Sequence, residues 1–260
     1  MRTAQTGAGG GEAAALPAGY RRIAFDRVDS TNDVARRFAE AGAGEGLAIT
    51  AQRQTSGRGR QGRSWISPHG NLHATFLLRP PVRAAQAGEF GFGVAVALAE
   101  TIEDLAAGCV RGGEAKCKWP NDVLVAGRKI AGILMESRGT PETLDWLIAG
   151  IGVNVAEAPA DTSWPATSLA ALGVEPSVER TLEALARRLD RWYRRWLADG
   201  FAPLRESWLA RAHALGRTFR IRRNGGEREG KFVGLDAGGA LVLELPGGRR
   251  ETISYGEVVE

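Results

Sequence analysis

The stretch that separates the candidate folds is Gln54-Thr55-Ser56-Gly57-Arg58-Gly59-Arg60-Gln61-Gly62-Arg63. The glycines at 57, 59 and 62 match the dinucleotide-binding fingerprint G-x-G-x-x-G. That fingerprint requires a helix opening at the loop and an acidic residue about twenty positions later. Here the loop continues into Trp65-Ile66-Ser67-Pro68-His69-Gly70, which is no helix, and the next acidic residue is Glu89. The sequence therefore argues against a Rossmann fold.

The charge around this loop indicates an anionic ligand. From Gly46 to Gly88 there is no Asp or Glu, while six arginines fall inside. Glycine lets the backbone approach a ligand closely, and arginine offers a planar fork for phosphate or carboxylate oxygens. No Walker A motif and no kinase catalytic-loop motif accompanies the loop. Taken alone, the loop fits a nucleotide and a nucleic acid equally well, because arginine-glycine segments also bind RNA.

The bulk composition is that of a soluble globular protein. Hydrophobic residues make up 43% of the chain, and the net charge of +4 is too small to demand nucleic acid. The two cysteines, Cys109 and Cys117, lack the spacing of a zinc site, so we expect reduced structural thiols and no metal-ligating residues. The N-terminus lacks a signal-peptide core, and the most apolar stretch, Phe90–Ala107, contains three acidic residues. We therefore expect a cytoplasmic protein with no membrane span.

The pattern along the chain predicts an α/β (α+β) protein with two folded domains. Residues 1–20 are rich in Gly and Ala and are predicted to form a flexible tail. Residues 21–215 alternate strand-like and helix-like segments, and residues 216–260 contain short strands separated by turn residues, as in a small SH3-like β-barrel. The expected strands of the first domain are Ile23–Val28, Leu47–Gln52, Asn71–Leu78, Lys116–Trp119, Val123–Val125, Lys129–Glu136 and Asp145–Val155. One helix is expected directly after Ser30 or Thr31. Three further helices are expected over Glu89–Ala106, Ser177–Asp199 and Ala202–Ala214. The expected strands of the second domain are Arg217–Arg223, Lys231–Leu235, Ala240–Leu245 and Glu251–Tyr255, with a turn at Asn224-Gly225-Gly226.

Two further strings carry candidate chemistry. In Lys118-Trp119-Pro120-Asn121-Asp122, proline restricts the backbone and Asn-Asp favours a turn, so Lys118 is predicted to be held at a strand end. The competing interpretation is an ordinary hairpin with an exposed lysine. In Gly150-Ile151-Gly152-Val153-Asn154-Val155, small residues alternate with β-branched ones. This predicts a narrow slot with a flat wall, and the competing interpretation is a plain core strand.

Together these strings resemble the catalytic domain of biotin protein ligases. The matching segments are Ser30-Thr31-Asn32, Gln54–Arg63 with Trp65, Lys118–Asp122 with Lys129–Leu134, Gly150–Val155, Ala166–Leu169 and Gly256-Glu257-Val258. The resemblance runs from about Ile23 to Val258. It implies a mixed-sheet catalytic domain that joins biotin to ATP as biotinyl-AMP and transfers biotin to a lysine of a biotin carboxyl carrier domain of a carboxylase. Biotin and ATP are then substrates, and Mg²⁺ is implied for the triphosphate.

The resemblance also implies roles for individual residues. Lys118 and Arg58 are the expected catalytic residues, because fixed positive charge is needed where a carboxylate meets a phosphate. The residues expected to bind biotin are Ser30, Thr31, Asn32, Gln54, Arg58, Gly59, Arg60, Lys118, Gly132, Gly150 and Gly152. The residues expected to bind the nucleotide are Arg58, Arg60, Arg63, Trp65, Asn154 and Trp164.

One feature of some members of that family is not predicted here. Only about 20 Gly/Ala-rich residues precede the first strand, too few for an N-terminal helix-turn-helix, so DNA binding is not expected. Two competing functions remain open at this stage. A lipoate or octanoate transferase would share the fold in outline, and a nucleic-acid-binding module would bind RNA or DNA in a salt-sensitive way without releasing pyrophosphate.

Overall fold

The computed structural model describes residues 14–109, 113–160, 162–223 and 226–259. The N-terminal strands are β1 (Arg21–Val28), β2 (Leu47–Gln54), β3 (Leu72–Leu78), β4 (Ala115–Lys118), β5 (Asp122–Val125), β6 (Arg128–Gly139) and β7 (Leu144–Val153). The helices are α1 (Thr31–Glu40), α2 (Phe90–Leu105), α3 (Val178–Asp199) and α4 (Ala202–Ala210). The C-terminal strands are β8 (Thr218–Arg223), β9 (Gly226–Leu235), β10 (Leu241–Glu244), β11 (Arg250–Ile253) and β12 (Glu257–Val259).

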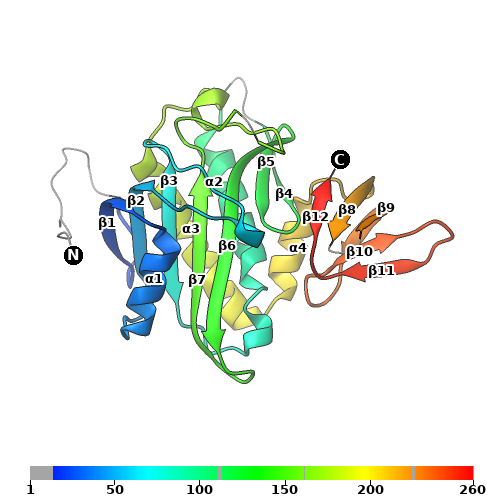
Figure 1. The fold of residues 1–260 in the computed structure, drawn as a ribbon, viewed down its shortest axis with the longest axis horizontal. Helices are drawn as coiled ribbons and strands as arrows, with labels where there is room; N and C mark the ends of the chain where they lie inside the picture. Colours follow the sequence, from blue (N-terminus) through cyan, green and yellow to red (C-terminus); the bar gives the residue numbers. More distant parts are fainter. Residues whose placement is uncertain (1–13, 110–112, 161, 224–225, 260) are drawn as a thin grey trace.

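These strands form two sheets that lie side by side (Figure 1). The larger sheet has the order β1-β2-β3-β7-β6-β5-β4; β1 and β2 are parallel, and the remaining neighbours are antiparallel. The smaller sheet is antiparallel with the order β11-β10-β9-β8-β12. The predicted fold class, a mixed-sheet α/β domain followed by a small SH3-like β domain, is confirmed.

The two faces of the larger sheet are covered by different helices (Figure 1). Successive strand residues point to opposite faces, so each strand contributes to two cores. On β7, Trp146 and Ile148 join the small core under α1, whereas Leu147 and Ala149 join the main core with α2 and α3. Beyond α1, the same face of β7 continues as Gly150 and Gly152. The face that α1 covers therefore ends in a strip without side chains.

The C-terminal domain packs into the main core. Phe232 of β9 lies 6.4 Å from the ring of Trp208 on α4, measured between centroids, and both belong to the main cluster of buried residues. A Cβ atom on Gly239 would lie 2.6 Å from the Phe92 ring on α2, and the Gly239 carbonyl accepts a hydrogen bond from the indole of Trp119. The domain is therefore held against the N-terminal domain by buried aromatic contacts.

Some details differ from the sequence-based expectations. The strand β12 was not predicted, because three residues are too few to show a period; it forms by pairing with β8. Helix α4 ends at Ala210 rather than Ala214. Ser177 caps α3 as predicted, with its hydroxyl accepting from the Arg180 N–H, whereas Ser30 occupies the N-cap position of α1 without a side-chain capping bond.

The predicted tail and one predicted turn fall partly outside the described residues. Residues 1–13 of the tail, and residues 224 and 225 of the turn, lie outside them. Within residues 14–20, Leu16 and Tyr20 pack against the main core. In the parts of the chain that are described, no helix is both long enough and apolar enough to span a membrane.

Candidate active site

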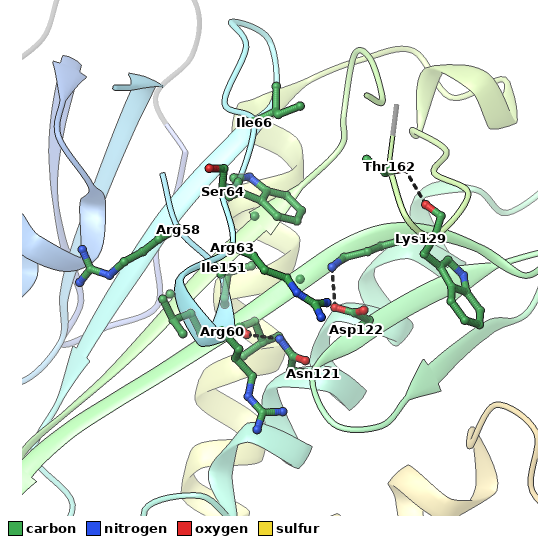
Figure 2. Close-up of a pocket in the computed structure, with 18 of the residues that line it drawn as sticks. Arg58, Arg60, Arg63, Ser64, Ile66, Asn121, Asp122, Lys129, Ile151 and Thr162 are labelled. Carbon is green, nitrogen blue, oxygen red and sulfur yellow. Dashed lines mark hydrogen bonds and ion pairs between the residues drawn. The ribbon is translucent and has the colours of Figure 1, made fainter. Parts of the chain in front are cut away.

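A single cavity of about 390 Å³ contains every residue that the sequence predicted for the site. It lies over the bare end of the α1 face of the sheet, between the loop at residues 57–66 and the segment at residues 162–166 (Figure 2). Its lining includes Ser30, Thr31, Asn32, Gln54, Arg58, Gly59, Arg60, Arg63, Trp65, Lys118, Gly132, Gly150, Gly152, Asn154 and Trp164. These side chains come from distant parts of the sequence, and the fold brings all of them together. The individual roles stay predictions.

The floor of the cavity is made of glycines that leave no room for a side chain. A Cβ atom on Gly150 would lie 2.1 Å from Oδ1 of Asn32, and one on Gly152 would lie 2.4 Å from the Trp65 ring. A Cβ atom on Gly132, on the neighbouring strand, would lie 2.9 Å from the same Trp65 ring. These glycines are therefore needed for close approach. The Asn32 amide and the Trp65 indole thus pack directly against these glycines, and a ligand in the cavity meets those two side chains rather than the strand itself.

One end of the cavity is lined by neutral polar side chains that form a hydrogen-bonded network anchored on the carboxylate of Glu136. The Gln54 carbonyl oxygen accepts from the backbone N–H of Thr31 at 2.8 Å and from its hydroxyl at 3.1 Å. The Thr75 hydroxyl lies 2.8 Å from Oγ1 of Thr31 and 2.7 Å from Oδ1 of Asn32. The Asn32 amide in turn donates to Glu136 at 2.6 Å. This network fixes the orientation of each polar group before a ligand arrives, and Thr75 and Glu136 were not predicted from the sequence.

The arginine-glycine loop folds back on itself as a tight hairpin. The Gly59 N–H donates to the Arg63 carbonyl at 2.7 Å, and the Trp65 N–H donates to the Gly57 carbonyl at 2.9 Å. Gly62 at the tip has a φ of 73°, a conformation that favours glycine. A Cβ atom on Gly57 would lie 2.5 Å from the Trp65 carbonyl oxygen. The glycines thus serve the hairpin itself, and the loop lies across the cavity.

The three arginines of this hairpin have different surroundings. Arg58 forms ion pairs with Asp33 and Glu136, and Arg63 forms one with Glu257 of β12. Among the residues that the structure describes, Arg60 makes no ion pair, and burial lowers the pKa of its guanidinium. Figure 2 shows the three guanidinium groups pointing in different directions, with that of Arg63 toward Asp122.

Two lysines share one carboxylate in the cavity. The Lys129 Nζ lies 2.7 Å from Oδ1 of Asp122, and the Lys118 Nζ lies 3.9 Å from Oδ2 of the same group (Figure 2 shows the first pair). The Lys118 side chain is only 4% exposed, and its Nζ lies 4.0 Å from the centre of the Trp164 ring. Burial lowers the pKa of Lys118, while Asp122 and Glu257 raise it. Lys129 is 26% exposed and was missed by the sequence-based site prediction. The sequence feature that could have pointed to Lys129 is its position three residues before Gly132, which was predicted to line the site.

The predicted nucleotide-side residues are also tied to the protein. The Asn154 side chain is 3% exposed and donates to the Thr167 carbonyl at 3.0 Å. The Trp164 indole donates to the Gly127 carbonyl at 2.9 Å. Asn154 therefore fixes the segment that carries Trp164, and its predicted contact with a nucleotide stays a prediction.

The C-terminal domain reaches the cavity directly. Gly256 and Glu257 are part of the lining, and Glu257 pairs with Arg63 of the loop. Arg63 in turn holds the pKa of Glu257 below its ordinary value. The sequence offered the Gly256-Glu257-Val258 string as a family match, but nothing in its spacing placed it in the site.

The cavity offers few groups for a metal ion. Its acidic lining residues, Asp122 and Glu257, both already pair with cationic side chains. No cluster of three or more His, Cys, Asp or Glu suited to a metal occurs within the described residues. In that same part of the chain both cysteines are free thiols, and burial raises the pKa of Cys117 to about 12, so this thiol stays neutral. The cavity thus combines neutral hydrogen-bonding groups at one end with cations at the other.

Comparison with known proteins identifies the family. Residues 24–154 match the biotin/lipoate A/B protein ligase family, and residues 214–259 match the biotin protein ligase C-terminal domain. The chain belongs to the biotin protein ligases. It is 39% identical, over 86% of its own length and 94% of the relative's, to a biotin–[acetyl-CoA-carboxylase] ligase of Paracoccus denitrificans. The resemblance on which the sequence analysis rested is confirmed.

Solved structures of biotin protein ligases share the whole fold. The Aquifex aeolicus enzyme in complex with biotin and ATP superposes with a TM-score of 0.76 at 28% identity, covering 92% of this chain and 97% of that one. The Leishmania major enzyme in complex with biotinyl-5-AMP gives a TM-score of 0.58 at 27% identity, covering 90% and 98%. Both domains of this ligase therefore have counterparts in proteins of known structure.

Proposed function

We propose that this ligase activates biotin with ATP and transfers it to a lysine of a biotin carboxyl carrier domain of a carboxylase. In the first step a biotin carboxylate oxygen attacks the α-phosphorus of ATP, and pyrophosphate leaves. In the second step the lysine amine attacks the acyl carbonyl of biotinyl-5′-AMP, AMP leaves, and the amine loses a proton. The acceptor supplies the nucleophile, so the enzyme itself needs none.

The observation that carries this proposal is the division of one cavity into a neutral polar end and a cationic end. Thr31, Asn32 and Gln54 are hydrogen-bonding groups of the kind that a ureido ring requires, and the Trp65 ring that packs on the glycines offers an apolar surface for the tail. Lys118 and Lys129 supply positive charge where two anions must meet. The known complexes of the A. aeolicus and L. major enzymes support this assignment.

Both lysines are proposed to act together in neutralising the reacting anions. Lys129 is the more exposed of the two, so it can contact a ligand without rearrangement. Lys118, the sequence-based choice, is almost fully buried and acts from beneath Trp164. Magnesium is proposed to enter as part of the MgATP substrate, because both acidic side chains of the cavity are already paired. The proposed location of the enzyme is the cytoplasm.

The test is ATP–pyrophosphate exchange with biotin, with lipoate and with neither acid. Exchange that requires biotin supports the proposal, and exchange that requires lipoate instead assigns the protein to the sister activity. Lys118→Ala and Lys129→Ala are each expected to lower the exchange rate at least about a hundredfold. Lys116→Ala is the matched control, because Lys116 lies on the same strand as Lys118 but pairs with Glu114 outside the cavity.

The second step is tested by transfer of labelled biotin to a purified biotin carboxyl carrier domain. No exchange with either acid in a folded sample containing magnesium would contradict the proposal.

A nucleic-acid-binding function is disfavoured by one observation. Arg58 and Arg63 of the basic loop are paired with carboxylates rather than presented on an open surface.

A further inference from the structure

The arginine that opens the hairpin is held by two carboxylates of the catalytic domain. Arg58 donates to both oxygens of Asp33, at 2.5 and 2.9 Å, and to Glu136 at 3.1 Å. Asp33 is in the first turn of α1, and Glu136 is on β6. In Figure 2 the Arg58 guanidinium points away from Lys129 and Asp122. A two-pronged pair of this kind fixes the direction of the side chain as well as its charge.

The same carboxylate also fixes a residue of the polar end. One carboxylate oxygen of Glu136, Oε2, accepts a hydrogen bond from the Asn32 amide at 2.6 Å. The other oxygen, Oε1, accepts one from the Arg58 guanidinium at 3.1 Å. Asn32 follows Thr31 at the start of α1, next to Asp33. Glu136 therefore joins the loop to the group that is proposed to bind the ureido ring, and a disturbance at one is transmitted to the other.

These ion pairs are partly shielded from solvent, so they can contribute to the position of the hairpin. The Arg58, Asp33 and Glu136 side chains are 29%, 14% and 29% exposed. Ion pairs at this depth are screened less than surface pairs. The hydrogen bonds to Asp33 raise the pKa of the Arg58 guanidinium. The group is thus committed to carboxylates on its own protein, unlike Arg60.

We propose that Asp33 and Glu136 are positioning residues that hold the hairpin closed over the cavity through Arg58. Arg58 then acts as a latch between the hairpin and the catalytic domain, and Arg60 is the hairpin cation that faces the ligand. The latch keeps the reactive biotinyl-adenylate covered until the acceptor lysine arrives, since an acyl-adenylate must be shielded from water. This inference rests on the proposed function.

The first test measures closure directly by limited proteolysis of the full chain with trypsin. The hairpin contains three arginines, so its opening exposes trypsin sites. Asp33→Asn and Glu136→Gln are expected to raise the rate of cleavage within residues 58–63 at least about tenfold, with little change in melting temperature. The matched control is Glu40→Gln, because Glu40 also joins α1 to β6, through Arg138 at 3.7 Å, but outside the cavity. Unchanged cleavage in both variants would overturn the latch.

The second test separates positioning from direct action on the substrate. Asp33→Asn is expected to raise the KM for biotin and the rate at which biotinyl-adenylate escapes into solution, each about tenfold, with a smaller change in kcat. Arg58→Lys keeps the charge but loses the fork, so it is expected to behave like Asp33→Asn. Combining the two is expected to add little beyond either single change.

The outcomes distinguish failure of the latch from failure of the proposed function. Additive effects of Asp33→Asn and Arg58→Lys would overturn the latch and assign Arg58 to direct contact with substrate. Wild-type kinetics in Asp33→Asn would also overturn it. If the unmodified protein performs no biotin-dependent exchange, the proposed function itself fails, whatever the trypsin result.

Discussion

Replacing Gly150 by alanine tests the glycine floor of the cavity. The added Cβ atom would lie 2.1 Å from Oδ1 of Asn32 and 2.8 Å from its Cγ and Nδ2. Ordinary contacts of a Cβ atom begin at 3.4 Å, so the Asn32 amide must retreat by more than an ångström. Asn32 is 3% exposed and packed between Thr75 and Glu136, so it has no open space to enter.

The magnitude follows from the contacts that Asn32 would lose. Its hydrogen bond to the Glu136 carboxylate, at 2.6 Å, is charge-assisted, and its bond from Thr75, at 2.7 Å, is neutral. Together such bonds contribute about 2–3 kcal/mol. Either Asn32 moves and biotin loses its partner, or biotin binding must restore the strained position. In both cases the affinity for biotin falls about 30- to 150-fold.

Isothermal titration calorimetry with biotin is the assay. We expect the Gly150→Ala protein to bind biotin about 30- to 150-fold more weakly, while its affinity for ATP alone changes less than about threefold. Gly88→Ala is the matched control, because a Cβ atom there meets nothing within 4 Å. Biotin binding within about threefold of wild type would refute the reasoning, since it would mean that Asn32 does not position the ligand.

Three further predictions concern charge and packing. Asp122→Asn removes a carboxylate that raises the pKa of the buried Lys118, so Lys118 should lose its proton at a lower pH and the alkaline fall in exchange rate should begin earlier in a pH–rate profile. Glu257→Gln should loosen the hairpin through Arg63 and raise the KM for ATP several-fold in steady-state kinetics; an unchanged KM would argue that the C-terminal domain does not shape the site. Phe232→Ala should lower stability by about 3–5 kcal/mol in urea unfolding, and the loss of a single cooperative transition would show that the two domains unfold separately.

The local patterns were readable because they obey local rules. The alternation around β7, the amphipathic α3 and the cap at Ser177 depend on neighbours a few residues away, so the elements could be predicted close to their observed bounds. The Gln54–Arg63 loop could be predicted to line a cavity, as it does, because its charge and glycine content are properties of one stretch, and its binding of an anion stays a prediction. A three-residue strand such as β12 carries no such period, and only its pairing with β8 creates it.

The partners of each charged side chain could not be read in the same way. Arg58, Arg60 and Arg63 look equivalent in the sequence. Yet Arg58 forms ion pairs with Asp33 and Glu136, whereas Arg63 pairs with Glu257, which is 194 residues further along the chain. Lys118 and Lys129 look like two separate lysines, yet the β4–β5–β6 meander brings both to Asp122.

By itself, then, the sequence determined most of the elements, the family and many of the residues around the cavity, because these depend on short-range periodicity and on motifs that keep their order. Only the tertiary structure decided which carboxylates pair with Arg58 and Arg63, that Arg60 makes no ion pair within the described residues, and that the C-terminal domain contributes to the lining of the cavity. Ion pairing depends on distances between elements that are far apart in the chain, and those distances exist only once the sheets have packed.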